Sequence, residues 1–129
     1  MDHERGHHHR ASHDARRITG SMKPLLFGAL MVAALVAAPA KQKFTGVVTD
    51  SMCSNADHKS MRMGPTDAEC TVACVQAHGA LYVLFDGKEV YTLSDQTAPE
   101  KFAGKKVTVT GILDAKTKTI RMDSIIAAK

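Results

Sequence analysis

Hydrophobic and polar residues alternate along much of residues 41–129, and this alternation is typical of half-buried β-strands. The stretch KKVTVTGILD alternates at Val107, Val109 and Leu113, and TIRMDSIIAA alternates again at Ile120 and Met122. The polar segment AKTK between them indicates a turn. These two stretches therefore predict the last two strands of the chain.

Three further strands are predicted upstream. The sequence ALYVLFDGKEVYTL contains two β-rich runs around Asp86-Gly87, a dipeptide that favours a tight β-hairpin. The segment KFTGVVTDSM, with Phe44, Val47 and Val48, predicts the first strand of the domain. The connector SDQTAPEKFAG predicts one helical turn that ends at Gly104.

One helix is predicted in PTDAECTVACVQAHG, after the first strand. Thr66 and Glu69 have the spacing of a capping box, and Gly79 is a typical helix stop. Five short strands with one helix predict a mainly β, α+β domain. We expect a small five-stranded antiparallel barrel of the oligonucleotide/oligosaccharide-binding (OB) type, with the helix in an insertion after the first strand.

The first 40 residues differ in composition from the rest. Residues 1–21 hold five of the seven histidines, have no apolar period and end in Gly-Ser, which indicates an expression tag. Residues 22–40 combine MKP, the apolar run LLFGALMVAALVAA and a final APA, the pattern of a secretory signal peptide. Residues 41–129 would then form a single periplasmic or secreted domain without stable membrane insertion. A retained membrane anchor is the alternative.

The charge of the predicted mature domain is small. Five of the 17 basic and three of the 13 acidic residues precede Lys41, which leaves a net charge of +2. The lysines are spread along strand-like segments, so nothing indicates a nucleic-acid partner. A domain of this size buries a limited core, and a disulfide or a metal would add useful stability.

The soft donor atoms of the domain gather in one segment. All three cysteines and both histidines outside the tag lie between positions 53 and 78, with the spacing C-x4-H-x11-C-x3-C-x3-H. These residues are Cys53, His58, Cys70, Cys74 and His78. The last three are four residues apart on the predicted helix and therefore share one face.

This pattern favours a metal site. Three thiolates with one imidazole form the usual tetrahedral set of structural zinc, here Cys53, His58, Cys70 and Cys74. His78 is either a solvated histidine at the helix end or a further ligand. In the second case the donors suffice for two zinc ions that share a thiolate. Asp50, Asp57 and Glu69 lie nearby in the sequence and are less favoured candidates.

Other functions remain open at this level. A disulfide from Cys53 to either helical cysteine would leave one thiol over, while the helical pair has poor geometry for bonding to itself. Met52, Met61 and Met63 offer thioethers that suit Cu(I), so a copper-handling or thiol-redox protein is an alternative. A zinc hydrolase is less favoured, because no motif such as HExxH is present. A dimer with a shared metal site is compatible with the same residues.

The segments GVVTDSMC, ECTVACVQAHGALYVLFDGKEVYTL and FAGKKVTVTGIL together resemble a family of small exported bacterial proteins known mostly as a domain of unknown function, especially from acidobacteria. The resemblance covers nearly all of residues 41–129, and Asp-Ser-x-Cys and Cys-x3-Cys are its most specific parts. It implies a small β-rich exported domain that binds a transition metal, with zinc favoured, as one ion or as a pair. It supports Cys53, His58, Cys70 and Cys74 as ligands and implies no enzymatic activity.

Overall fold

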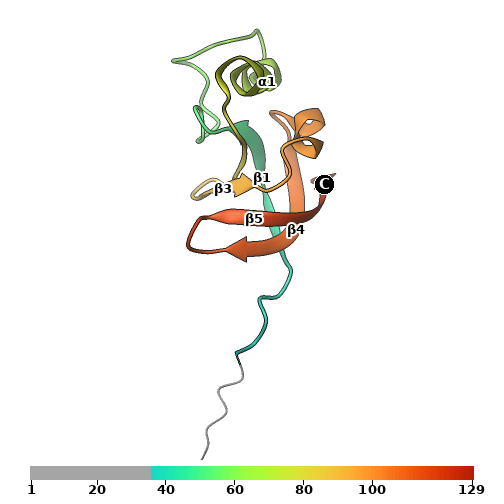
Figure 1. Cartoon of the computed structure of the whole chain (residues 1–129). Helices are drawn as coiled ribbons and strands as arrows, with labels where there is room; N and C mark the ends of the chain where they lie inside the picture. The colour runs from blue at the N-terminus through green and yellow to red at the C-terminus, as the bar shows by residue number, and fades with distance from the viewer. Residues whose placement is uncertain (1–35) are drawn as a thin grey trace, which may run out of the picture. The chain divides into compact units, whose positions relative to one another are not determined.

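The computed structural model describes residues 36–129, which fold around five β-strands and one α-helix (Figure 1). In chain order the elements are β1 (Gln42–Asp50), α1 (Asp67–His78), β2 (Tyr82–Phe85), β3 (Val90–Leu93), the 3-10 helix η1 (Ala98–Phe102), β4 (Lys106–Asp114) and β5 (Thr119–Ala127). The prediction of a mainly β domain with one helix after the first strand is confirmed. The predicted tag and residues 22–35 of the predicted signal peptide lie outside the described residues. Within 36–129, no helix is long and apolar enough to cross a membrane.

The five strands form one sheet whose pairings close in the order β1-β2-β3-β5-β4. The nine-residue strand β1 pairs with two other strands: residues 42–47 pair with β4, and residues 47–50 pair with β2. Gly46 lies where the neighbour changes, and a Cβ at this position would be 2.4 Å from the carbonyl oxygen of Phe85. Glycine is therefore required here, because the backbones of β1 and β2 approach each other closely.

The prediction of a purely antiparallel sheet is wrong at one pair of strands. β3 and β5 run parallel, with Thr92 opposite Thr119 and Leu93 opposite Ile120, whereas the other four pairs are antiparallel. After β3 the chain passes through η1 and β4 and returns along β5 in the direction of β3. Alternation of side chains reports which face a residue occupies, and it carries no information on the direction of the neighbouring strand.

The hydrophobic core fills the interior of the closed sheet. Its buried members are Val48, Tyr82, Leu84, Leu93, Ala103, Val107, Val109 and Ile120. Three of them, Val107, Val109 and Ile120, come from strand positions that the alternation had marked, and Val48 belongs to the predicted first strand. Full burial of one such aliphatic side chain contributes roughly 1.5–3 kcal/mol, so the core is the main source of stability for the sheet.

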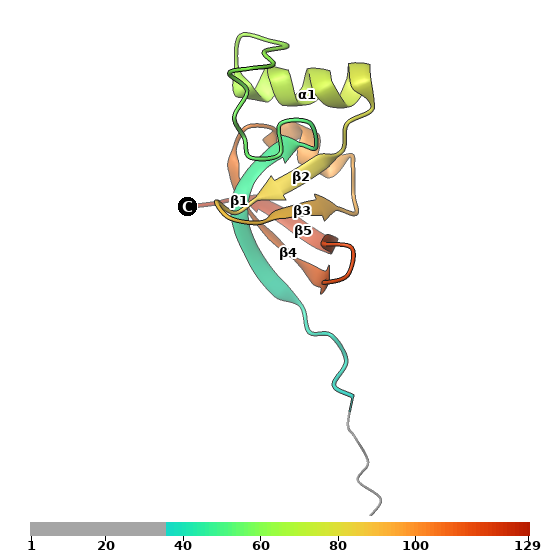
Figure 2. The ribbon, with the colours of Figure 1, turned by 90° about the vertical axis from the view of Figure 1, so that its left-hand side faces the viewer.

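The helix α1 lies across one end of the sheet (Figure 2). Its start matches the predicted capping box, because the Thr66 hydroxyl accepts from the Glu69 N–H and the Glu69 carboxylate accepts from the Thr66 N–H. Its end matches as well, because Gly79 has a φ of 67° in the left-handed region. Val72 and Val75 pack against the core and attach the helix to the sheet.

The turn that follows η1 supports the start of α1. Gly104 has a φ of 71°, and its N–H donates to the carbonyl of Val48 at 2.8 Å. A Cβ on Gly104 would lie 2.9 Å from the backbone nitrogen of Ala68. The first turn of α1 therefore rests directly on the backbone of this glycine.

The hairpin between β2 and β3 turns at the predicted Asp86-Gly87. The Asp86 carboxylate accepts N–H bonds from Glu89 at 2.7 Å and from Lys88 at 2.8 Å, and Gly87 has a φ of 98°. These two backbone donors hold the pKa of the Asp86 carboxyl below its ordinary value of 3.8, because they favour the charged form.

We expect Asp86→Ala to lower the melting temperature at neutral pH by a modest amount that disappears in strong acid. The folded-state pKa lies below the unfolded value of 3.8, so the carboxylate stabilises the fold above that value. The contribution is lost as the pH falls through the folded-state pKa. Thermal melts at neutral and acidic pH test this, with Lys88→Ala as a control that keeps the backbone donor. An equal deficit at every pH would contradict it.

Candidate metal centre

The candidate metal centre begins at the end of β1, where Asp50 turns the chain. Its Oδ1 accepts N–H bonds from Met52 and Cys53, each at 2.9 Å. Such a carboxylate-to-backbone turn bends the chain out of the strand and fixes Cys53 beside the carboxylate. Asp50 is fully buried and Cys53 is 6% exposed, so both lie in the protein interior.

A tight loop then brings His58 back to the end of β1. The Ala56 N–H donates to the carbonyl of Cys53 at 2.9 Å, and Ala56 has a φ of 59° in the left-handed region. The Asp57 carboxylate accepts from the Lys59 N–H at 3.0 Å and forms the next turn. As a result the imidazole of His58 points inward and is almost fully buried.

Thr49 sets the orientation of this imidazole. The Thr49 hydroxyl donates to the carbonyl of Cys53 at 2.8 Å, and its oxygen lies 3.4 Å from Nε2 of His58. Because the hydroxyl hydrogen is already used, the oxygen can only accept from Nε2–H. In the neutral ring the second nitrogen, Nδ1, then presents its lone pair.

Asp50, Cys53 and His58 together form a buried group that could bind a metal. Each places one ligand atom within 4.8 Å of the other two. Oδ2 of Asp50 and Nδ1 of His58 lie 3.9 Å apart, and neither has a hydrogen-bond partner within residues 36–129. This distance is too long for a hydrogen bond, and buried polar atoms nearly always have a partner. A cation suits both atoms, since each offers a lone pair.

The helix α1 brings Cys70 and Cys74 close to this group. Both side chains are fully buried, and all three cysteines are free thiols. Burial raises the pKa of the Cys74 thiol, the nearby acidic groups Asp50, Cys53 and Cys70 raise it further, and so does the direct approach of the Asp50 carboxylate to this thiol. Burial also raises the pKa of Cys53, followed by the charges of Asp50 and Cys70. The helical thiols are thus near enough to act electrostatically on the Asp50–Cys53–His58 group.

The structure brings together only some of the candidates from the sequence. Cys53 and His58 lie together, and Asp50, a less favoured candidate, completes the group. Cys70 and Cys74 are buried but lie outside the 4.8 Å group, so their role as ligands stays a prediction.

The remaining three candidates are exposed. His78 lies in the last turn of α1 and is not part of the group. Asp57 forms a loop turn, and Glu69 is the capping-box partner of Thr66. The sequence signal that could have ranked Asp50 higher is its position at the end of a buried strand, directly before Ser-x-Cys.

Comparisons with known proteins add no relative: no family model, no curated protein and no solved structure matches this chain.

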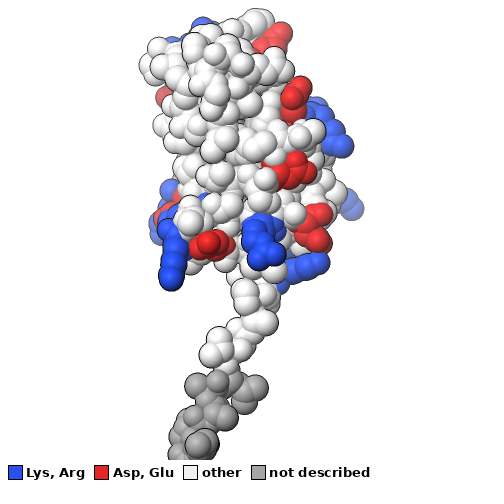
Figure 3. Space-filling view, viewed as in Figure 1, with Lys and Arg blue, Asp and Glu red and all other residues white. Residues whose placement is uncertain are grey.

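The surface is not strongly polarised on the face shown in Figure 3, where acidic and basic side chains intermingle and the end that carries α1 is mostly uncharged. The buried donor group is therefore the feature of the described chain that indicates a function.

We expect a thiol titration of the metal-free, denatured and unreduced protein to count three thiols, because all three cysteines are free in the structure. A bond from Cys53 to a helical cysteine would leave one. Titration of the same sample after reduction provides the control, and it should give the same count. A count that rises on reduction would support the disulfide-stapled alternative.

Proposed function

We propose that this protein is a metal-binding domain whose centre is built on Asp50, Cys53 and His58, with zinc as the metal. The observation that carries the proposal is the pair of buried atoms, Oδ2 of Asp50 and Nδ1 of His58, that face each other at 3.9 Å without hydrogen-bond partners in the described part of the chain. A carboxylate and the lone pair of an imidazole attract the same cation.

The distances suit zinc. A nitrogen and an oxygen that bind one tetrahedral zinc at the usual bond lengths lie about 3.4 Å apart, so the pair at 3.9 Å needs only a small side-chain adjustment. Thiolate, imidazole and carboxylate are all zinc ligands, and Cys53 supplies the thiolate. We propose that Cys74 and Cys70 complete the set from α1. Zinc would then tie the insertion to β1 and contribute directly to folding.

Copper handling is the second candidate function. Met52, Met61 and Met63 are between 42% and 46% exposed, an unusual display of apolar side chains along one loop. Thioethers and thiolates bind Cu(I) in preference to harder metals. Elemental analysis of the purified protein, followed by competition between zinc and Cu(I), separates the two candidates. A dinuclear zinc centre, the further possibility raised by the sequence, would be seen as two equivalents of metal.

We also propose a fold type, a family and a location for this protein. The closed order β1-β2-β3-β5-β4 and the insertion between β1 and β2 support a barrel of the OB type. The Asp-Ser-x-Cys and Cys-x3-Cys motifs support membership of the exported bacterial family that the chain resembles. The apolar run and Ala-Pro-Ala of residues 22–40 support export to the periplasm or the medium.

Asp50→Asn tests the proposal directly. The asparagine keeps an oxygen for the N–H groups of Met52 and Cys53, while its amide group can donate to Nδ1 of His58. We expect metal affinity to fall by more than the about 100-fold that loss of an outer-sphere partner costs. We also expect the metal-free variant to melt no lower than the metal-free wild type, because a buried charge is gone.

The matched control is Asp57→Asn. Asp57 lies in the same loop and accepts a backbone N–H in the same way, but it is exposed and outside the group. Titration calorimetry with zinc and thermal melts with and without metal give both readouts. Wild-type zinc affinity in Asp50→Asn would refute the proposed centre.

Removal of the metal should expose the loop between His58 and α1 to proteolysis. Lys59 and Arg62 are exposed trypsin sites in this loop, which carries a proposed ligand at its start. We expect a chelator to speed cleavage at both positions, and zinc to restore protection. Lys88 and Lys116, exposed in distant hairpin turns, are internal controls whose cleavage should not change. Equal cleavage with and without metal would argue against a structural role.

A further inference from the structure

We infer that the backbone amides of Met63 and Gly64 orient the Cys70 sulfur as a ligand of the proposed centre, and that Gly64 is the positioning residue on which this depends. The inference rests on the proposed function and extends it to a residue that binds no metal itself. It also assigns a role to the loop between His58 and α1. The Asp50–Cys53–His58 group by itself gives this loop no role.

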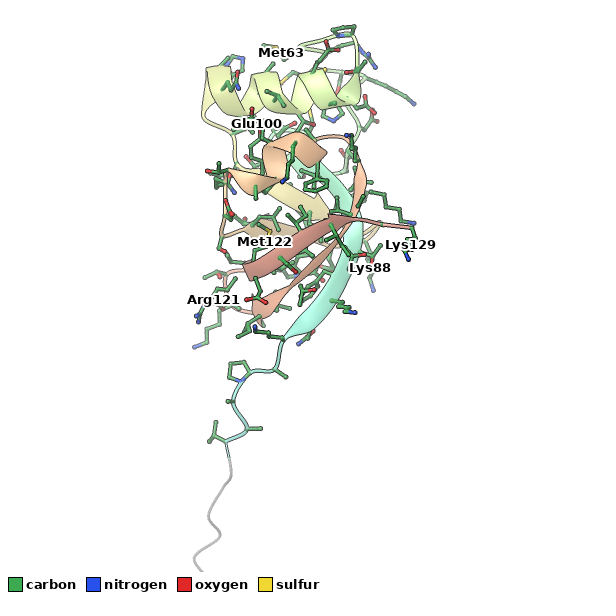
Figure 4. The ribbon with its side chains drawn as sticks, turned by 90° about the vertical axis from the view of Figure 1, so that its right-hand side faces the viewer. Met63, Lys88, Glu100, Arg121, Met122 and Lys129 are labelled. Carbon is green, nitrogen blue, oxygen red and sulfur yellow. The ribbon has the colours of Figure 1, made fainter. Side chains whose placement is uncertain are left out.

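Two hydrogen bonds converge on one sulfur atom. Sγ of Cys70 accepts from the Met63 N–H at 3.1 Å and from the Gly64 N–H at 3.2 Å, and as a neutral thiol it donates to the Gly64 carbonyl at 3.4 Å. Neutral thiols are weak acceptors, whereas hydrogen bonds to an ionised acceptor are shorter and stronger. Loss of the thiol proton on metal binding would end the long bond to the Gly64 carbonyl and strengthen the two that the amides donate, so these amides suit a metal-bound thiolate. Figure 4 shows Met63 beside α1, at the end of the molecule opposite Arg121.

The approach of these amides requires a glycine at position 64. A Cβ there would lie 2.7 Å from Cβ of Glu69 and 3.3 Å from the backbone nitrogen of Cys70. Glu69 cannot easily move away, because it is held in the capping box with Thr66. A larger residue would therefore push the loop off the first turn of α1 and withdraw both donors from the sulfur.

The same loop is connected to the centre at both ends. It leaves His58, whose imidazole belongs to the metal-binding group, and it reaches Cys70 through the two amides. The amides thus connect the helical thiol to the part of the site formed by β1 and the loop.

The experiment uses Co²⁺ as a probe for the zinc site in the full chain. Bound thiolates give Co²⁺ a charge-transfer absorption in the near ultraviolet whose intensity follows the number of sulfur ligands. We expect Cys70→Ser to lose the share of this band due to one thiolate. We expect Gly64→Ala to shift the band and to weaken Co²⁺ and zinc binding by about 10- to 100-fold, as loss of an outer-sphere partner does.

Gly104→Ala is the matched control. Its new Cβ would lie 2.9 Å from the backbone of Ala68, in the same first turn of α1. In the described chain, however, no hydrogen bond joins Gly104 to the sulfur of Cys70. It should destabilise the protein without a change in the Co²⁺ spectrum. Circular dichroism verifies that each variant is folded. If Gly64→Ala does not fold, the Co²⁺ spectrum of Cys70→Ser still tests whether the Cys70 sulfur is a ligand.

Two results would overturn the inference. One is a wild-type spectrum and affinity in Cys70→Ser, and the other is a spectral change in Gly104→Ala equal to that in Gly64→Ala. Failure of the proposed function looks different, because the wild-type protein would then bind neither Co²⁺ nor zinc.

Discussion

The buried carboxylate of Asp50 is the group on which both the insertion and the candidate centre depend. One of its oxygens ends β1 by accepting the N–H groups of Met52 and Cys53, and the other faces His58 at 3.9 Å. A charge buried this completely is costly unless it is compensated. Two backbone donors compensate one side of the carboxylate, and the proposed cation would compensate the other.

The attachment of α1 explains why a metal would matter here. The fully buried residues of the helix are Cys70, Thr71 and Cys74, which are small and carry polar atoms. Larger apolar residues such as Val72 and Val75 are only partly buried against the core. Hydrophobic burial therefore holds the helix to the sheet weakly, and coordination by its thiols would supply a stronger link between α1 and β1.

Local signals in the sequence were sufficient for most of the elements. The hairpin at Asp86-Gly87, the capping box of Thr66 and Glu69 and the stop at Gly79 all formed as predicted, since each depends on residues close together in the chain. The parallel pairing of β3 with β5 was missed because it joins strands separated by η1 and β4.

The sequence by itself determined the type of domain and the chemistry of its donors, because alternation, turn residues and the clustering of cysteine and histidine are local properties. Only the tertiary structure decided which donors meet. The stripe from Cys70 to His78 spans about 12 Å at the rise of an α-helix, so one small centre cannot take donors from both of its ends, and the structure leaves His78 exposed and outside the buried group. Asp50 enters the group for the opposite reason: the turn at the end of β1 and the loop after it return Cys53 and His58 to its side.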